Sequence, residues 1–235
     1  PLQVLAYTVA PNILTLESTG SGSSSFLQLK NKGVTPVAVE FTIHKHRKDI
    51  DGKAIKGAEA ADDFIIYPPQ LVMIPGDELA VQVLWIGDAE LDTERTYTIV
   101  THQVQIPQKV ANLPESSAGI SLDIKVLINY EGRIYVTPLG AKPNVVVESV
   151  AQHTPTKSVG EDQGSPEPLF LEVILANQGM AHQPMAKMSL VFVPLDLAGS
   201  PLKQLAITLP STKIPGMKPH LLAGERRRLF IVRPK

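Results

Sequence analysis

Two histidines come closest to a pattern that could bind a metal ion. His44 and His46 are two residues apart on a predicted strand, so their side chains share one outward face. Imidazole suits several transition metals, and this spacing is compatible with two ligands. The other histidines are scattered and add no third ligand: His102, His153, His182 and His220. We therefore expect solvated surface histidines, with a metal enzyme or metal carrier as the weakest alternative.

The charged clusters also lack a recognisable chemistry. The acidic residues around the predicted loop 47–62 are Asp49, Asp51, Glu59, Asp62 and Asp63, and they do not have EF-hand spacing. Three successive arginines, 226–228, divide between the two faces of a strand, which favours an exposed edge. There is no cysteine, no G-x-S-x-G, no P-loop and no dinucleotide fingerprint. The sequence predicts a protein that is not an enzyme and that has no cofactor.

One row of apolar side chains could act on a partner by filling a groove. Residues 122–130 read L-D-I-K-V-L-I-N-Y, and alternation places five large side chains on one face: Leu122, Ile124, Val126, Ile128 and Tyr130. The other face is polar except for Leu127. On pattern alone this is either an ordinary half-buried strand or a strand that pairs with another protein.

The rest of the chain indicates an all-β protein that positions this row. The 235 residues are 43% hydrophobic and include 20 prolines and 16 glycines, and apolar residues alternate along several short segments. Two β-sandwiches are expected, over 1–138 and 139–235. The net charge of −1 argues against a nucleic-acid partner. Because the chain starts at Pro1, we expect that a signal peptide was removed or that the sequence was trimmed.

A weak internal repeat supports two similar modules. The segment L-K-N-K-G (29–33) resembles L-A-N-Q-G (175–179), and I-P-G-D-E (74–78) resembles L-A-G-E-R (222–226). The asparagines are 146 residues apart (177 − 31) and the glycines 148 (224 − 76). By this correspondence the second module ends one or two strands early, so it is incomplete or differs in topology.

An ordered set of motifs in the first module resembles the periplasmic chaperones of the chaperone–usher pilus pathway. The set comprises Pro68-Pro69, Pro75-Gly76, Ile106-Pro107 and the aliphatic stretch 122–128 followed by Arg133. The resemblance implies two immunoglobulin-like β-sandwich domains in an L-shaped arrangement. It also implies a periplasmic chaperone of a Gram-negative cell that caps pilus subunits and delivers them to an outer-membrane usher.

The resemblance implies particular site residues. The strand lent to the subunit would present Leu122, Ile124, Val126 and Ile128. Arg133 matches the lysine that holds the subunit's terminal carboxylate, whereas the family's second basic residue would fall near Asn12, which is neutral. Val110 and Leu113, in the predicted loop 108–119, could form a further apolar contact with the subunit or a small cluster of their own.

Other departures indicate a divergent branch of that family. A glutamate and an arginine that usually pair are replaced here by Thr96 and Thr137, so both charges are lost together. The main alternative function is a two-module immunoglobulin-like adhesion or binding protein, in which the row 122–130 is internal. An unpartnered aliphatic edge would also be expected to self-associate or to be covered.

Overall fold

The computed structural model describes residues 7–106, 126–153, 170–217 and 219–232. These ranges contain strands and short 3₁₀ turns but no α-helix, which confirms the predicted all-β class. Within them there is no helix long and apolar enough to cross a membrane. The chain forms two compact units. Unit 1 comprises Pro1–His46, Lys56–Leu91 and Arg95–Leu139, and unit 2 comprises Arg47–Ile55, Asp92–Glu94 and Gly140–Lys235.

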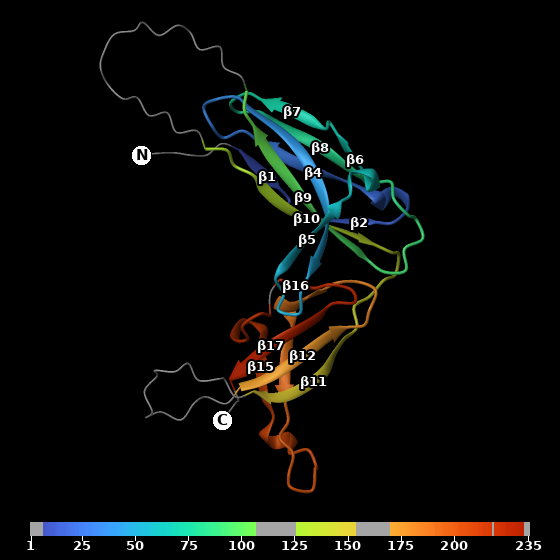
Figure 1. The fold of residues 1–235 in the computed structure, drawn as a ribbon, viewed down its shortest axis with the longest axis vertical. Helices are drawn as coiled ribbons and strands as arrows, with labels where there is room; N and C mark the ends of the chain where they lie inside the picture. The colour runs from blue at the N-terminus through green and yellow to red at the C-terminus, as the bar shows by residue number, and fades with distance from the viewer. Residues whose placement is uncertain (1–6, 107–125, 154–169, 218, 233–235) are drawn as a thin grey trace, which may run out of the picture. The chain divides into compact units, whose positions relative to one another are not determined.

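Unit 1 contains two packed sheets (Figure 1). The first has the order β1-β3-β8-β6, and the second has the order β2-β10-β9-β4-β5, with β7 also pairing with β4. The strands are β1 (Thr8–Ala10), β2 (Ile13–Glu17), β3 (Ser24–Lys30), β4 (Val37–Lys48), β5 (Ala54–Glu59), β6 (Phe64–Tyr67), β7 (Gln70–Met73), β8 (Glu78–Trp85), β9 (Arg95–Val104) and β10 (Tyr130–Thr137). The 3₁₀ turns are η1 (Gly20–Ser23) and η2 (Ala61–Asp63).

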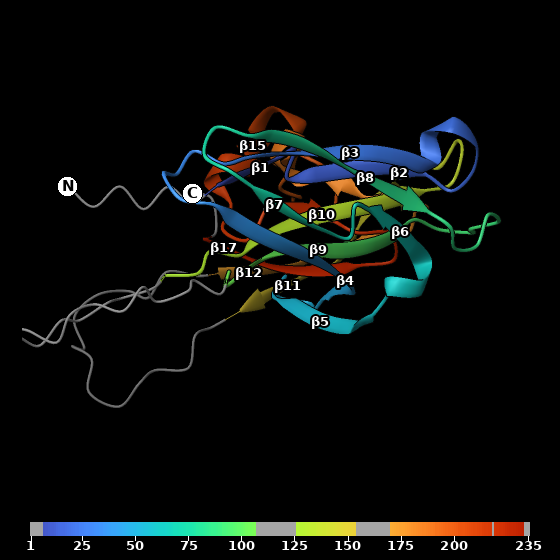
Figure 2. The same ribbon diagram turned by 90° about the horizontal axis from the view of Figure 1, so that it is seen from above.

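Alternating side chains build the core between these sheets. Val81, Val83 and Trp85 point inward from β8, and Val39 and Ile43 point inward from β4; all five are at most 4% exposed. Figure 2 shows β3 and β8 in one layer and β9 and β4 in the other. The predicted loop over 47–62 is wrong in part, because β4 extends to Lys48 and β5 occupies Ala54–Glu59.

Unit 2 is built around the three-stranded sheet β11-β12-β17. Two small antiparallel pairs accompany it, β13 with β16 and β14 with β15. The strands are β11 (Val145–His153), β12 (Phe170–Asn177), β13 (Gln183–Pro184), β14 (Ser189–Phe192), β15 (Ile207–Pro210), β16 (His220–Leu221) and β17 (Arg226–Val232). The 3₁₀ turns are η3 (Met185–Lys187), η4 (Lys203–Leu205) and η5 (Ser211–Lys213). Met185, Met217 and Leu221 are fully buried against the sheet.

The repeat read from the sequence has matching hydrogen bonds in the two units. Asn31 and Asn177 are each 1% exposed. In both cases the asparagine Oδ1 accepts a hydrogen bond from the N–H of the glycine two residues later, at 2.9 Å for Gly33 and 3.1 Å for Gly179. The backbone carbonyls of the two asparagines accept from the N–H of Gly76 and Gly224, at 3.1 and 2.9 Å. Each asparagine therefore joins the end of one strand to the turn before another.

The turns themselves also match. Gly76 and Gly224 have φ angles of 91° and 71°, which glycine adopts without the steric cost of a side chain. The following acidic residue accepts a hydrogen bond from the backbone N–H three residues earlier in both units. For Asp77 the donor is Ile74, at 2.9 Å, and for Glu225 it is Leu222, at 2.7 Å.

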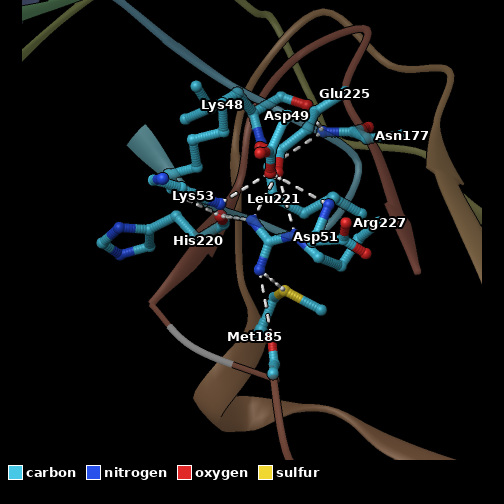
Figure 3. Close-up of polar contacts among 12 residues, drawn as sticks. Lys48, Asp49, Asp51, Lys53, Asn177, Met185, His220, Leu221, Glu225 and Arg227 are labelled. Atoms are coloured by element: carbon cyan, nitrogen blue, oxygen red, sulfur yellow. Dashed lines mark hydrogen bonds and ion pairs between the residues drawn. The ribbon is translucent and has the colours of Figure 1, made fainter. Parts of the chain in front are cut away.

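Unit 2 adds a buried ion pair to this turn (Figure 3). The Arg227 side chain is 1% exposed and contacts the carboxylate of Glu225 through Nε and Nη2. Its Nη1 donates to the carbonyl of Gly216 at 3.0 Å, and its Nη2 donates to the carbonyl of His220 at 3.3 Å. The three arginines thus divide between two faces of a terminal strand, as predicted, but Arg227 lies in the core, which corrects the expectation that all three are exposed.

Candidate functional site

Only part of the predicted apolar row lies in the described residues. Leu122 and Ile124, as well as the loop residues Val110 and Leu113, lie outside them. Val126 is 55% exposed, whereas Ile128 is partly buried against the core of unit 1. Residues 126–129 precede β10 and are not in a strand, although the sequence predicted a strand over 122–130.

Side chains hold this segment next to β9. The regular β9–β10 ladder begins at Tyr130 opposite Thr101. Beyond it, the Ile128 N–H donates to Gln103 Oε1 at 3.1 Å, and the Gln103 N–H donates to Asn129 Oδ1 at 3.2 Å. Two side-chain amides thus take the place of main-chain pairing, so the 126–129 backbone is fixed on one side without a continuous ladder.

Two tyrosines attach the same segment to the core. The Tyr7 hydroxyl lies 3.0 Å from the carbonyl oxygen of Ile128 and 3.1 Å from that of Thr101, so its single proton is shared between the two acceptors. Tyr130 donates to the Tyr7 carbonyl, and the two rings meet edge to face with centroids 4.9 Å apart. Burial raises the pKa of Tyr7 above its ordinary value, with Tyr130 contributing. Tyr7 is therefore a neutral donor at physiological pH.

The other border of β10 is covered over only part of its length. β2 pairs with it in parallel from Ile13 opposite Arg133 to Glu17 opposite Thr137. Asn12 extends this contact, because its carbonyl accepts from the Arg133 N–H at 2.9 Å. In the described part of the chain, residues 130–132 of β10 have β9 as their only strand neighbour. Among the described residues, the border from Gly132 towards Val126 therefore has no second strand beside it.

Arg133 lies where this border begins. Its side chain is 28% exposed, and Nη1 donates to Thr98 Oγ1 at 2.9 Å. The carboxylate of Glu131 is 4.0 Å away, which makes a weak ion pair at most. The predicted pair Arg133 and Asn12 is thus adjacent, but Asn12 contributes its backbone carbonyl to Arg133 and its side chain is exposed. The guanidinium retains exposed surface with which to bind an anion.

A hydrogen-bonded pair behind Arg133 was not predicted. Thr98 Oγ1 lies 3.2 Å from His46 Nδ1, and His46 is 7% exposed. The strand register explains the arrangement. Arg133 on β10 and His44 on β4 both lie opposite Thr98 on β9, and His46 is two residues from His44, on the same face of β4. Alternation could have placed these residues on one face, but the register that aligns them is not readable from sequence.

The prediction that the histidines are solvated at the surface is wrong for several of them. His46 is buried, and His182 pairs with Glu94 through Nδ1 at 2.9 Å in unit 2. Burial lowers the pKa of His220, and the nearby charges of His182 and Lys48 lower it further. Among the described residues, no group of three or more histidine, cysteine or acidic side chains could hold a metal ion.

Comparison with known proteins gives a consistent picture. The family described as pili and flagellar-assembly chaperone, PapD N-terminal domain, matches residues 9–134. The class 5 fimbriae chaperone CfaA is similar in structure, with a TM-score of 0.60 and 9% identity over 97% of this chain and 87% of that chain. No curated protein matches.

Two further solved structures share the fold. The E. coli chaperone DraB has a TM-score of 0.54 and 12% identity over 98% of this chain and 87% of that one. A chain from the complex of the Salmonella enterica SafA pilin with the SafB chaperone has a TM-score of 0.54 and 14% identity, over 99% and 86% of the two chains. These likenesses confirm the predicted two-domain immunoglobulin-like fold.

Proposed function

Since the chain belongs to the family of pili and flagellar-assembly chaperones, we propose that it holds a pilus subunit by lending it the strand from Leu122 to Ile128. The proposal rests mainly on the border that runs from Gly132 in β10 back to Val126, which has no second strand neighbour in the described residues. A subunit strand that added here would gain main-chain hydrogen bonds as well as apolar contacts.

The expected energies suit a carrier. Four aliphatic side chains buried in a subunit groove contribute on the order of 6–12 kcal/mol, at about 1.5–3 kcal/mol each. Association costs on the order of 4–15 kcal/mol, so these two contributions nearly balance, and main-chain hydrogen bonds at about 0.5–1.5 kcal/mol each supply the surplus. Such a complex is firm, yet a better-fitting strand can displace the lent one.

Arg133 is proposed to bind the terminal carboxylate of the subunit. Its guanidinium is partly exposed, lies beside the open border and is oriented by Thr98. A guanidinium can contact both oxygens of a carboxylate at once, which fixes the register of the added strand. The neutral Asn12 supports this site through its carbonyl, so the anchor uses a single charge.

The site of action is proposed to be the periplasm, with delivery of the subunit to an outer-membrane usher. Leu113 and Val110 are proposed as a further apolar contact with the subunit. Both lie outside the described residues, so this contact rests on the sequence alone.

Co-expression with a pilus subunit that lacks its own last strand tests the lent strand. The wild-type chain should be recovered in a one-to-one complex, and Val126→Asp combined with Ile124→Asp should abolish that complex. Val72→Asp is a matched control, because Val72 on β7 is 58% exposed and Val126 is 55% exposed. A complex that survives the double change excludes strand lending and favours an adhesion or binding module.

The anchor is tested with subunit peptides that end in a free carboxylate or in an amide. Wild-type protein should bind the free carboxylate about tenfold or more tightly, since a hydrogen bond to a charged group contributes about 1.5–3 kcal/mol. Arg133→Gln should remove this preference while leaving the affinity for the amide unchanged. Equal binding of both peptides by the wild type would exclude the anchor.

A further inference from the structure

A turn closed by one aspartate forms part of unit 2. Asp49 Oδ1 accepts hydrogen bonds from the N–H groups of Asp51, at 3.0 Å, and Lys53, at 2.8 Å. The Asp49 N–H donates to the Lys53 carbonyl at 3.0 Å, and the Gly52 N–H donates to the Asp49 carbonyl at 2.9 Å. We call residues 49–53 the first tip; they connect β4 to β5.

The same turn recurs between β14 and β15. Asp196 Oδ1 accepts from the N–H groups of Ala198, at 2.9 Å, and Ser200, at 2.8 Å. The Asp196 N–H donates to the Ser200 carbonyl at 2.9 Å, and the Gly199 N–H donates to the Asp196 carbonyl at 3.0 Å. We call residues 195–201 the second tip. Asp196 follows Asp49 by 147 residues (196 − 49), which falls between the two offsets of the internal repeat.

The contacts of the first tip show what such a turn can bind. Within unit 2 it lies against the outer border of β17, where the carbonyl of Ile50 accepts from the Arg228 N–H at 2.7 Å. The Asp51 carboxylate accepts two hydrogen bonds from the Arg228 guanidinium, at 2.8 and 3.0 Å. Gly52 passes so close to Arg227 that an added Cβ would lie 2.6 Å from Cζ. The first tip therefore covers a sheet border through one backbone bond and one ion pair.

The second tip has the same backbone but apolar, exposed side chains. Leu197 takes the place of Ile50 and is fully exposed, and Leu195 is 63% exposed. Ala198 takes the place of Asp51, so the carboxylate that binds Arg228 has no counterpart. In Figure 1 this tip projects from the end of unit 2 as an orange loop that precedes β15. A turn of this kind fits a sheet border that offers apolar side chains and no arginine.

Unit 2 itself carries a border of that description. β11 is the terminal strand of its sheet and, in the described part of the chain, pairs with β12 alone. Val147 and Val150 on it are each 54% exposed. The register shift between Val147 and Ser149 interrupts this border, which disfavours a long added strand but leaves room for a single backbone bond. The sequence of β11 contains no arginine.

We propose that the second tip binds the β11 border of a second copy of this chain. Leu197 would pack beside Val150, and its carbonyl would accept one backbone hydrogen bond, as that of Ile50 does on β17. The contact is small compared with a stable interface, so the association is weak and depends on protein concentration. It does not rest on the proposed binding of a pilus subunit.

Sedimentation of the full chain tests this association. The wild type should shift from monomer towards larger species as its concentration rises, and Leu197→Asp should weaken the association about tenfold or more, because a charge replaces a leucine that the contact would bury. Val34→Asp is a matched control, since Val34 is 92% exposed in unit 1. A monomer at all concentrations overturns the proposal. So does association that Leu197→Asp retains and Val126→Asp abolishes, because it would then depend on the lent strand.

Cross-linking identifies the surface. The chain has no cysteine, so single cysteines can be placed at will. Ala198→Cys mixed with Ala151→Cys should form a mixed disulfide about tenfold faster than Ala198→Cys mixed with Thr35→Cys, because binding raises the local concentration. All three positions are exposed. Equal rates overturn the assignment to β11.

Discussion

Asn31 in unit 1 and Asn177 in unit 2 make the same hydrogen bonds to the glycines near them, but their side chains differ in the number of other backbone groups that they contact. Asn31 Nδ2 donates to the carbonyls of Thr35 and Met73. Asn177 Nδ2 lies within 2.8–3.2 Å of the carbonyls of Ala181, Leu221 and Leu222, and its Oδ1 accepts from a second backbone N–H, that of Asn144. A buried polar side chain is tolerated in both units because it satisfies backbone groups that would otherwise be unpaired.

The position after the turn shows where the two units diverge. Leu79 in β8 is 37% exposed, whereas its counterpart 148 residues later is the buried Arg227. Hydrogen bonds fix the turn in both units, but packing beside it follows the surroundings of each unit. The two units therefore share the backbone hydrogen bonds of the turn but differ in the side chain that follows it.

The largest expected effect comes from breaking the buried Arg227–Glu225 ion pair of unit 2. Arg227→Met should destabilise unit 2 by about 3–5 kcal/mol, because Glu225 would stay buried without its cation. Hydrogen exchange of unit 2 peptides measures the loss. Adding Glu225→Gln should recover most of it, and Leu79→Met in unit 1 should change little. Equal protection of wild type and Arg227→Met would show that the pair contributes no stability.

Replacing either asparagine should destabilise the unit that contains it. Asn177→Ala should destabilise unit 2 by about 2–4 kcal/mol and Asn31→Ala should destabilise unit 1 by about 1–3 kcal/mol, since each substitution strands buried backbone groups. The larger value belongs to the asparagine with more partners. Urea denaturation, followed in each unit by hydrogen exchange, gives both numbers. A larger loss of stability for Asn31→Ala than for Asn177→Ala would show that the number of hydrogen-bond partners does not determine the effect.

The two turn glycines should respond alike. Gly76→Ala and Gly224→Ala should each cost about 1–2 kcal/mol, because an alanine in the left-handed region is strained. An added Cβ meets no heavy atom within 4 Å at either position, so backbone strain acts without a clash. The same hydrogen-exchange measurement applies. Losses that differ widely between the units would show that the turns are not equivalent.

The smallest effect is expected at the exposed pair Asp51–Arg228. The hydrogen bonds from the Arg228 guanidinium are the main cause that lowers the pKa of Asp51. The charged carboxylate therefore stabilises the folded state above its ordinary pKa of about 3.9, and this contribution is lost as pH falls through the lowered value. Asp51→Asn should be slightly less stable than wild type near pH 7, with the gap closing as pH falls below the ordinary pKa of about 3.9 and at high salt. A gap that is constant across pH would exclude the ion pair as its cause.

Much of the fold could be predicted because alternation reports directly on buried faces. Val81, Val83 and Trp85 are inward as the period of two requires, and the Asn31–Asn177 repeat is visible as a shared spacing. Arg227 could not be predicted as buried, because a charge at a core position runs against the hydrophobic pattern. β5 was missed because its six residues carry exposed and charged side chains that resemble a loop.

The candidate site was predictable only in outline. The likeness of residues 122–133 to a known motif pointed to Arg133, but Thr98 and His46 reach it through strand register, which depends on contacts distant in sequence. The second aspartate turn could have been found from D-x-x-G at residues 49–52 and 196–199. The likeness is hard to recognise because the two residues after the aspartate are Ile50-Asp51 in the first turn and Leu197-Ala198 in the second.

Unit 2 also includes two short pieces from the first half of the chain, Arg47–Ile55 and Asp92–Glu94. Recombination that replaced everything after Leu139 would remove Arg228 and His182, the partners of Asp51 and Glu94. The hybrid would keep these two contacts only if the donor gene supplied equivalent residues. Hybrid genes should yield a stable protein more often when the twelve codons of these two pieces are inherited together with the downstream half of the gene.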